Sequence, residues 1–295
     1  MNDASLAAPA THVEPEPRGF GGRPDWLAHT ILGLGVVLFA LPVWLAIAGS
    51  TQRTSDIANG HLSLLPRLSG LYVYPEVLLN GAPGAGPVWR MLLISGAMAL
   101  SIAFGKLVIS VLSAYAVVFF RFPFRKTAFW IIFITLMLPV EVRLVPTYSV
   151  MSDLHIINTF AGLTVPLIAS ATATLLFRQT FAAIPDELVE AARMDGAGPL
   201  RFLWDILLPV SAANIAALFV ILFVYGWNQY LWPLLVAADP KLDTVVIGIV
   251  KMIGLDTATE WNRVMATAVL ALLPPVGVVL LMQRWFVRGL TEGEK

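Results

Sequence analysis

Long apolar segments, separated by short polar ones, dominate this sequence. A helix that crosses the hydrocarbon core of a bilayer needs about 20 apolar residues, and six stretches reach that length. Their approximate limits are residues 27–49, 91–119, 128–150, 160–182, 211–236 and 264–286. They are continuously apolar rather than alternating, which favours helices over the strands of a membrane β-barrel. The pattern therefore predicts an all-α polytopic membrane protein with six transmembrane helices.

The composition excludes several other classes of protein. Hydrophobic residues make up 58% of the chain and charged residues only 13%, about half of the charged share that is usual in soluble domains. The net charge is zero and there is no cysteine, so nothing suggests nucleic-acid binding, disulfides or a thiolate metal site. The four histidines are scattered, and we expect no bound metal.

The lysines and arginines predict the orientation in the membrane. Positive residues favour the cytoplasmic side, and most of those outside the spans fall on one side if the amino terminus is inside. Both termini are then cytoplasmic, and residues 50–90 and 237–263 are the large external segments. Residues 1–25 are polar and rich in proline and glycine, which predicts a disordered cytoplasmic tail. Residues 26–295 form the transmembrane domain.

One polar stretch, "EAARMDGAGPLRFLWDILLP", interrupts the apolar pattern in the predicted cytoplasmic loop 183–210. Pro185 and the acidic residues after it suit the start of a helix. Gly196 suits its end, because glycine adopts positive φ at little cost. Gly198-Pro199 permits a sharp turn before a second short helix, from Leu200 to about Leu207. The stretch predicts two short helices joined by a glycine turn near the membrane surface.

Such a loop could simply be an interfacial amphipathic link between two spans, or it could dock onto a partner. The spacing favours docking. Glu190-Ala191-Ala192 is followed by Gly196, then by nine variable residues and by Ile206, Leu208 and Pro209. These residues match every defined position of the pattern E-A-A-x-x-x-G-x9-I-x-L-P.

This pattern is the EAA motif, and the chain resembles the permease subunits of type I carbohydrate ABC importers from about Trp26 to its end. Similar stretches include residues 129–147, 169–181, 225–235 and 282–290. Within the family, the chain is most similar to permeases for sn-glycerol-3-phosphate. The resemblance implies a permease fold with a cytoplasmic coupling helix, in the bacterial inner membrane. The residues it assigns to ATPase coupling are Glu190, Ala191, Ala192, Asp195, Gly196, Ile206 and Pro209.

The resemblance also implies three kinds of partner besides the lipid bilayer: a homologous second permease, a cytoplasmic ABC ATPase dimer and an external solute-binding protein. The sequence lacks the pattern G-x-x-x-x-G-K-[ST], whose glycines cradle ATP phosphates. We therefore expect this chain to be a transport subunit and not an enzyme. It would hold no cofactor, and ATP and magnesium would bind the partner ATPase.

Polar residues inside the predicted spans are candidates for the solute pathway, because charge within a membrane is costly and usually has a purpose. Lys106 lies in the second span with Ser110 and Ser113 at helical spacing. It could line the pathway, pair within a helix interface or extend its charge to the membrane surface.

Two further pairs of polar residues lie in the third and fifth spans. Glu141 and Arg143 stand between Pro139 and Pro146, where a broken helix is expected. Arg143 could attract a phosphate, although a local structure or a gate contact is an equal alternative. Asn228 and Gln229 follow Trp227 and could line the pathway or hydrogen-bond between helices.

The expected solute is sn-glycerol-3-phosphate or a related glycerophosphodiester. A neutral sugar, such as a maltose-type oligosaccharide, is the alternative within the same family. A stand-alone secondary transporter would show inverted repeats or paired broken helices. No clear repeat is visible in the sequence, and that class would leave the EAA motif unexplained.

Overall fold

The computed structural model describes residues 26–135, 139–254 and 259–292, with side chains except at 140, 141 and 284–292. The predicted tail, residues 1–25, lies outside this part. Apart from one isolated bridge between Ala82 and Ala85, the regular structure of the described residues is helical. The chain divides into two compact units at Val43. The all-α class predicted from the apolar runs is confirmed.

Helix α1 (Trp26–Ser50) begins in the first unit and ends in the second. Apart from His29 and Thr30, its first 18 residues, up to Val43, are apolar around the whole helix, and all 18 except the half-buried Gly35 are exposed. A helix that is hydrophobic on every side suits a hydrocarbon environment. This agrees with the predicted first span, 27–49.

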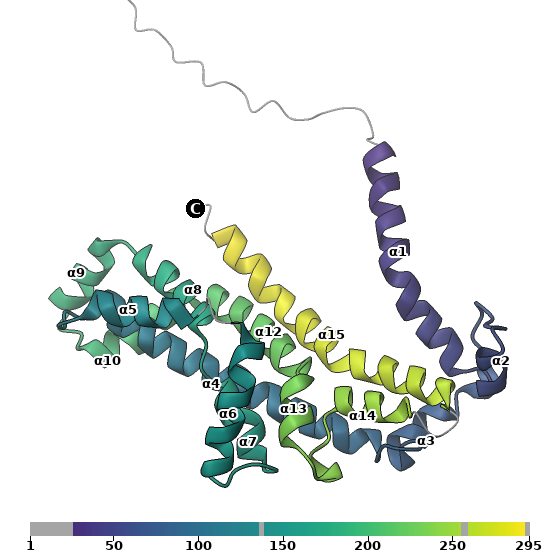
Figure 1. Cartoon of the computed structure of the whole chain (residues 1–295). Coiled ribbons are helices and arrows are strands. Elements are labelled where there is room, and N and C mark those ends of the chain that lie inside the picture. Colours follow the sequence, from purple (N-terminus) through teal and green to yellow (C-terminus); the bar gives the residue numbers. More distant parts are fainter. Residues whose placement is uncertain (1–25, 136–138, 255–258, 293–295) are drawn as a thin grey trace, which may run out of the picture. The chain divides into compact units, whose positions relative to one another are not determined.

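Helix α4 (Val88–Phe119) is the central helix of the second unit (Figure 1). It packs against α8 (Ala171–Ala182) and α12 (Ala212–Trp227), and α12 packs in turn against α15 (Trp261–Glu292). Gly226 lies so close to α4 that a Cβ atom added there would be 2.9 Å from the Cα atom of Ala99. Small residues allow such close packing where lipid supplies no hydrophobic drive for helix association.

Three predicted spans are not single helices. The predicted span 128–150 is divided between α5 (Arg125–Ile134) and α6 (Val140–Asp153), on either side of residues 136–138. The span 160–182 consists of α7 (Phe160–Thr164), the 3-10 turn η3 (Val165–Leu167) and α8, with a bend of 45°. The span 211–236 breaks between α12 and α13 (Leu231–Val236).

Proline explains two of these breaks. Pro139 directly precedes α6, and Pro166 lies in the 3-10 turn η3; neither can donate a backbone hydrogen bond. By length and hydropathy, three helices of the described chain could each cross a membrane, or up to five spans result if each bent pair counts as one. The count of six therefore stays a prediction.

The two predicted external segments come together at the amino-terminal end of α4. They form short helices: α2 (Thr54–Ala58), η1 (Leu68–Gly70), α3 (Val73–Asn80), η5 (Pro240–Leu242) and α14 (Val245–Met252). Arg263 of α15 pairs with Glu76 of α3, and the Lys251 Nζ atom lies 2.7 Å from the carboxylate of the buried Asp243. We call residues 51–87 and 238–254 the cap.

The contact between α4 and α12 gives a stability prediction. Gly226→Ala should force the two helices apart, because the new methyl group meets backbone rather than a movable side chain. Overpacking of this kind costs about 1–3 kcal/mol, so the melting temperature of the purified complex in detergent should fall by several degrees. Gly277→Ala in α15 is the control, because a Cβ atom there has nothing within 4 Å. An equal melting temperature for both variants would contradict the close packing.

Candidate functional site

Helix α9 (Asp186–Met194) is the first half of the predicted coupling loop. Asp186 and Glu187 occupy its first turn and Arg193 its last, so the charges at both ends complement the helix dipole. The helix begins after Pro185, which precedes the first turn instead of lying within it.

Gly196 ends this helix as the sequence predicted. Its φ angle is +74°, the left-handed conformation that glycine adopts at low cost. The backbone N–H of Gly196 donates to the Arg193 carbonyl over 3.0 Å, and that of Ala197 donates to the Ala192 carbonyl over 2.9 Å. These two bonds form a Schellman motif, which pairs the last carbonyls of the helix and reverses the chain.

The residues assigned to ATPase coupling are divided between two faces of α9 and its turn. Glu190, Ala191, Asp195 and Gly196 are exposed, whereas Ala192 is buried. Met194 is also 87% exposed. The loop therefore exposes acidic and small residues together with Met194 on one side, and its other side, with Ala192, packs against the rest of the protein.

The second half of the loop differs in detail from the predicted helix 200–207. It begins with α10 (Pro199–Phe202), continues as a π-helical turn (Leu203–Leu207) and ends in α11 (Leu208–Val210). The wider π turn ends two residues before Pro209, whose ring would clash with a carbonyl of a regular α-helix. Of the motif residues here, Ile206 is half-buried and Pro209 is exposed.

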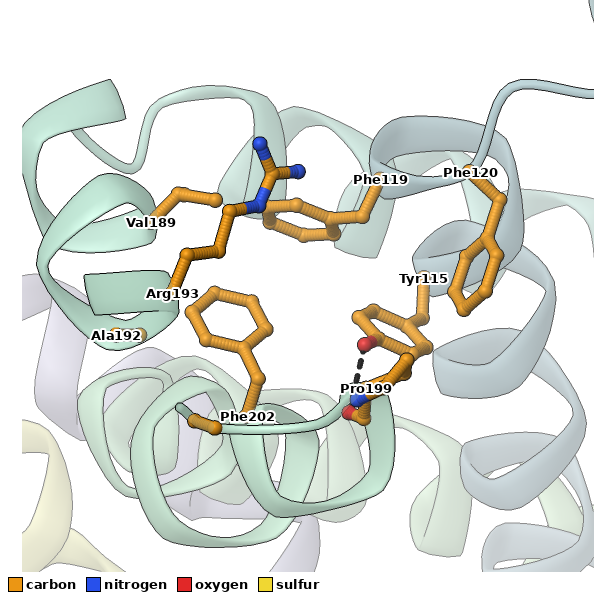
Figure 2. A pocket seen from close by; sticks show the side chains of 9 residues that line it. Tyr115, Phe119, Phe120, Val189, Ala192, Arg193, Pro199 and Phe202 are labelled. Atoms are coloured by element: carbon orange, nitrogen blue, oxygen red, sulfur yellow. Dashed lines mark hydrogen bonds between the residues drawn. The ribbon is translucent and has the colours of Figure 1, made fainter. Parts of the chain in front are cut away.

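An aromatic cluster, formed by Tyr115, Phe119 and Phe202, joins the coupling loop to α4 (Figure 2). The hydroxyl of Tyr115 donates a hydrogen bond of 2.7 Å to the carbonyl of Pro199. The ring of Phe202 lies 5.2 Å from that of Phe119 and 6.4 Å from that of Tyr115. The loop is thus held to the end of the central helix by packing and by a specific hydrogen bond.

Between this cluster and α9 lies a cavity of about 300 Å³. Val189, Ala192 and Arg193 of α9 line it from one side, and Arg193 extends toward Phe119 (Figure 2). Sequence analysis did not assign a role to the aromatic cluster. The only signal was the spacing of Tyr115 and Phe119, one helical turn apart at the end of an apolar run.

A second, smaller cavity brings together Lys106 and Arg143, two of the predicted pathway residues. Its volume is about 90 Å³, and its lining comes from α4, α6, α12, α13 and the break before α8. Lys106 is buried, and its Nζ atom lies 3.6 Å from the centre of the Tyr225 ring. Arg143 is exposed.

Asn228 and Gln229, two of the other predicted pathway residues, are not among the residues that line this cavity. Asn228 follows the last residue of α12 and is exposed, and the Gln229 side chain donates to the Tyr225 carbonyl over 3.1 Å. The side chain of Glu141 lies outside the described part of the chain. Among the described residues, no group of three histidines, cysteines or carboxylates could hold a metal ion.

Comparison with known proteins gives consistent results. Residues 106–292 match the family model described as "Binding-protein-dependent transport system inner membrane component". The chain is 57% identical over 272 residues to the "sn-glycerol-3-phosphate transport system permease protein UgpE" of Agrobacterium fabrum, covering 91% of this chain and 96% of the relative. Relatives with the same name are 54% identical in Rhizobium meliloti, with the same coverage, and 51% identical in Yersinia pestis, covering 92% of this chain and 97% of the relative.

A solved structure supports the fold. It is a chain of a bacterial ABC transporter involved in the import of the acidic polysaccharide alginate, 22% identical, with a TM-score of 0.78 over 90% of this chain and 99% of that chain. The family model covers more than half of the protein, and the curated relatives are similar over nearly its whole length. The chain therefore belongs to the binding-protein-dependent transport system inner membrane components, the permease subunits of ABC importers.

Proposed function

We propose that this chain is a permease subunit that imports sn-glycerol-3-phosphate, or a related glycerophosphodiester, across the bacterial inner membrane. The observation that carries the solute assignment is the identity of 51–57% to permeases named for sn-glycerol-3-phosphate, over 91–92% of the chain. The chain forms half of the translocation pathway, and a homologous second permease forms the other half.

The ATPase-coupling role is assigned to α9 and its glycine turn. The exposed residues Glu190, Ala191 and Asp195 offer a narrow charged face that a cleft of the ATPase could accept. The buried side of the same helix contacts the cavity beside Tyr115 and Phe119. A force applied to α9 would pass along the glycine turn to Pro199 and Phe202, and from them to Tyr115 and Phe119 of α4.

In this proposal, a cytoplasmic ABC ATPase dimer hydrolyses ATP with magnesium, and an external solute-binding protein delivers the solute to the cap. Asn228, Gln229 and Glu141 remain candidates for the pathway or its gate. Both termini are assigned to the cytoplasm on the distribution of positive charge in the sequence.

The solute assignment is tested with the complete complex in proteoliposomes. It contains this chain, the second permease, the ATPase and the binding protein, and each solute is added in turn. We expect sn-glycerol-3-phosphate or a glycerophosphodiester to stimulate ATP hydrolysis several-fold and to accumulate inside. Stimulation by maltose instead would overturn the solute and keep the importer.

The glycine turn gives a second prediction. Gly196→Val should impair coupling, because a β-branched residue does not readily adopt a φ of +74° and the left-handed conformation costs about 1–2 kcal/mol for an ordinary residue. We expect a several-fold loss of solute-stimulated ATP hydrolysis and uptake, measured in the same proteoliposomes.

Gly198→Ala is the matched control for this variant. A Cβ atom has open space around it at both glycines, but only Gly196 has a positive φ. Gly198→Ala should therefore retain activity. Wild-type rates in both variants would remove the turn from the coupling mechanism.

The hydrogen bond between Tyr115 and Pro199 gives a third prediction. Tyr115→Phe keeps the aromatic packing but removes a hydrogen bond worth about 1 kcal/mol. Movement of the loop should therefore be transmitted to α4 less completely. The expected result is a lower ratio of solute imported to ATP hydrolysed. Tyr72→Phe, an exposed position in the cap, should leave that ratio unchanged. An unaltered ratio in Tyr115→Phe would show that packing alone transmits the motion.

A further inference from the structure

We propose that Lys106 and Arg143 form a phosphoryl-binding site in this subunit, which holds the phosphate of the solute during its passage. The inference rests on the proposed function and deepens it. It assigns to this permease a direct contact with the anionic part of the solute, so that selectivity does not reside in the binding protein alone.

The first observation is the convergence of two cations. Lys106 comes from the middle of α4 and Arg143 from the first turns of α6, and both line the same cavity of about 90 Å³. None of the residues that line the cavity in the described part of the chain is acidic. The described lining therefore concentrates positive charge without a carboxylate to neutralise it.

The second observation is the environment of Lys106. The residue is only 5% exposed, and its described contact is the face of the Tyr225 ring, 3.6 Å away. Such a cation–π contact orients the ammonium group, and the N–H donors that point away from the ring remain available to other acceptors. No salt bridge to Lys106 is formed by a carboxylate in the described part of the chain, and an unpaired buried ammonium group is costly within a membrane, which points to an anionic ligand.

The third observation is the complementary chemistry of the two side chains. The guanidinium of Arg143 is a planar fork that matches two phosphate oxygens, whereas the ammonium of Lys106 acts as a compact point charge. Thr147 lines the same cavity, one helical turn after Arg143, and its hydroxyl can donate a further bond. A phosphate monoester carries up to two negative charges near neutral pH, which two cations would balance.

One carbonyl of the broken helix next to the cavity has a side-chain partner on α4. Ala169 lies in the break between η3 and α8, where irregular backbone lines the cavity. The nearby carbonyl of Ser170 already accepts a bond of 3.3 Å from the hydroxyl of Ser110, the residue one turn after Lys106. The two polar residues of α4 therefore have different roles. Ser110 donates a hydrogen bond to a carbonyl of the broken helix, and Lys106 faces the cavity.

The size of the cavity limits what it can hold. A volume of about 90 Å³ leaves room for a phosphoryl group. The glycerol part would remain outside, on the side where Arg143 is exposed. The site would therefore recognise the phosphate and place few demands on the group attached to it.

Binding is tested on the purified complex of both permeases and the ATPase, without the binding protein. The melting temperature is measured with sn-glycerol-3-phosphate, with inorganic phosphate and with glycerol as the neutral analogue. We expect the two phosphates to stabilise the wild-type complex and glycerol to have no effect. Lys106→Gln and Arg143→Gln should each raise the phosphate concentration that gives half-maximal stabilisation at least tenfold.

Two controls separate this role from a general effect of charge. Arg90→Gln removes a positive charge from an exposed site near the start of the same helix α4 and should behave as the wild type. Arg143→Lys should recover part of the stabilisation, because it keeps the charge but loses the fork. With saturating loaded binding protein, the glutamine variants should also import sn-glycerol-3-phosphate at least tenfold more slowly.

Each outcome decides the proposal. Failure of the wild-type complex to import sn-glycerol-3-phosphate would overturn the proposed function and this inference with it. Normal import by the wild type, with unchanged stabilisation and uptake in both glutamine variants, would overturn the inference alone. Stabilisation by phosphatidylglycerol but not by free solute would assign the cavity to lipid and also overturn it. If Lys106→Gln does not assemble, the exposed Arg143 decides the result by itself.

Discussion

The close approach of α4 and α12 is the contact on which the other features of the second unit depend. In lipid, apolar surface does not drive helices together, so association relies on intimate packing. Gly226 and Ala99 provide it, and the fully buried Ala103 and Ala114 continue the small-residue surface along α4. With α4 fixed against α8 and α12, one helix carries the cap at its beginning, Lys106 in its middle and Tyr115 near its end.

The broken helices around α4 are the second organising feature, and the backbone groups that they leave unpaired need other partners within the membrane. Side chains supply the missing partners. The hydroxyl of Thr159 accepts from the Gly162 N–H over 3.0 Å, and the indole N–H of Trp232 donates to the Gly162 carbonyl over 3.0 Å. Irregular backbone is thereby tolerated beside α4, and the short segments meet around the cavity of Lys106 instead of forming a continuous wall.

The sequence predicted the features that depend on local chemistry. Apolar runs indicated helices and their approximate limits, and the positive φ of Gly196 followed from the preference of glycine for the end of a helix. The breaks of the third to fifth spans were missed in part, because a proline within an apolar run can either kink or end a helix and only tertiary contacts decide which. The joint cavity of Lys106 and Arg143 was equally out of reach, since 36 residues separate the two in the sequence. The contact of Tyr115 with Pro199 depends on the same long-range folding.

Because α4 carries both Lys106 and Tyr115, ATPase coupling and solute contact could depend on the movement of this one helix. Lys106 and Tyr115 are nine residues apart on α4, or roughly 13.5 Å along a regular helix. A helix of this length, packed on two sides, moves more readily as a body than it bends between two such close points. Displacement of α9, passed along its turn to Phe202 and the aromatic cluster, would then shift Lys106 relative to Arg143, which lies on the separate short helix α6. The proposed phosphoryl site would open or close as a direct geometric consequence of that displacement, without any intervening chain of small rearrangements.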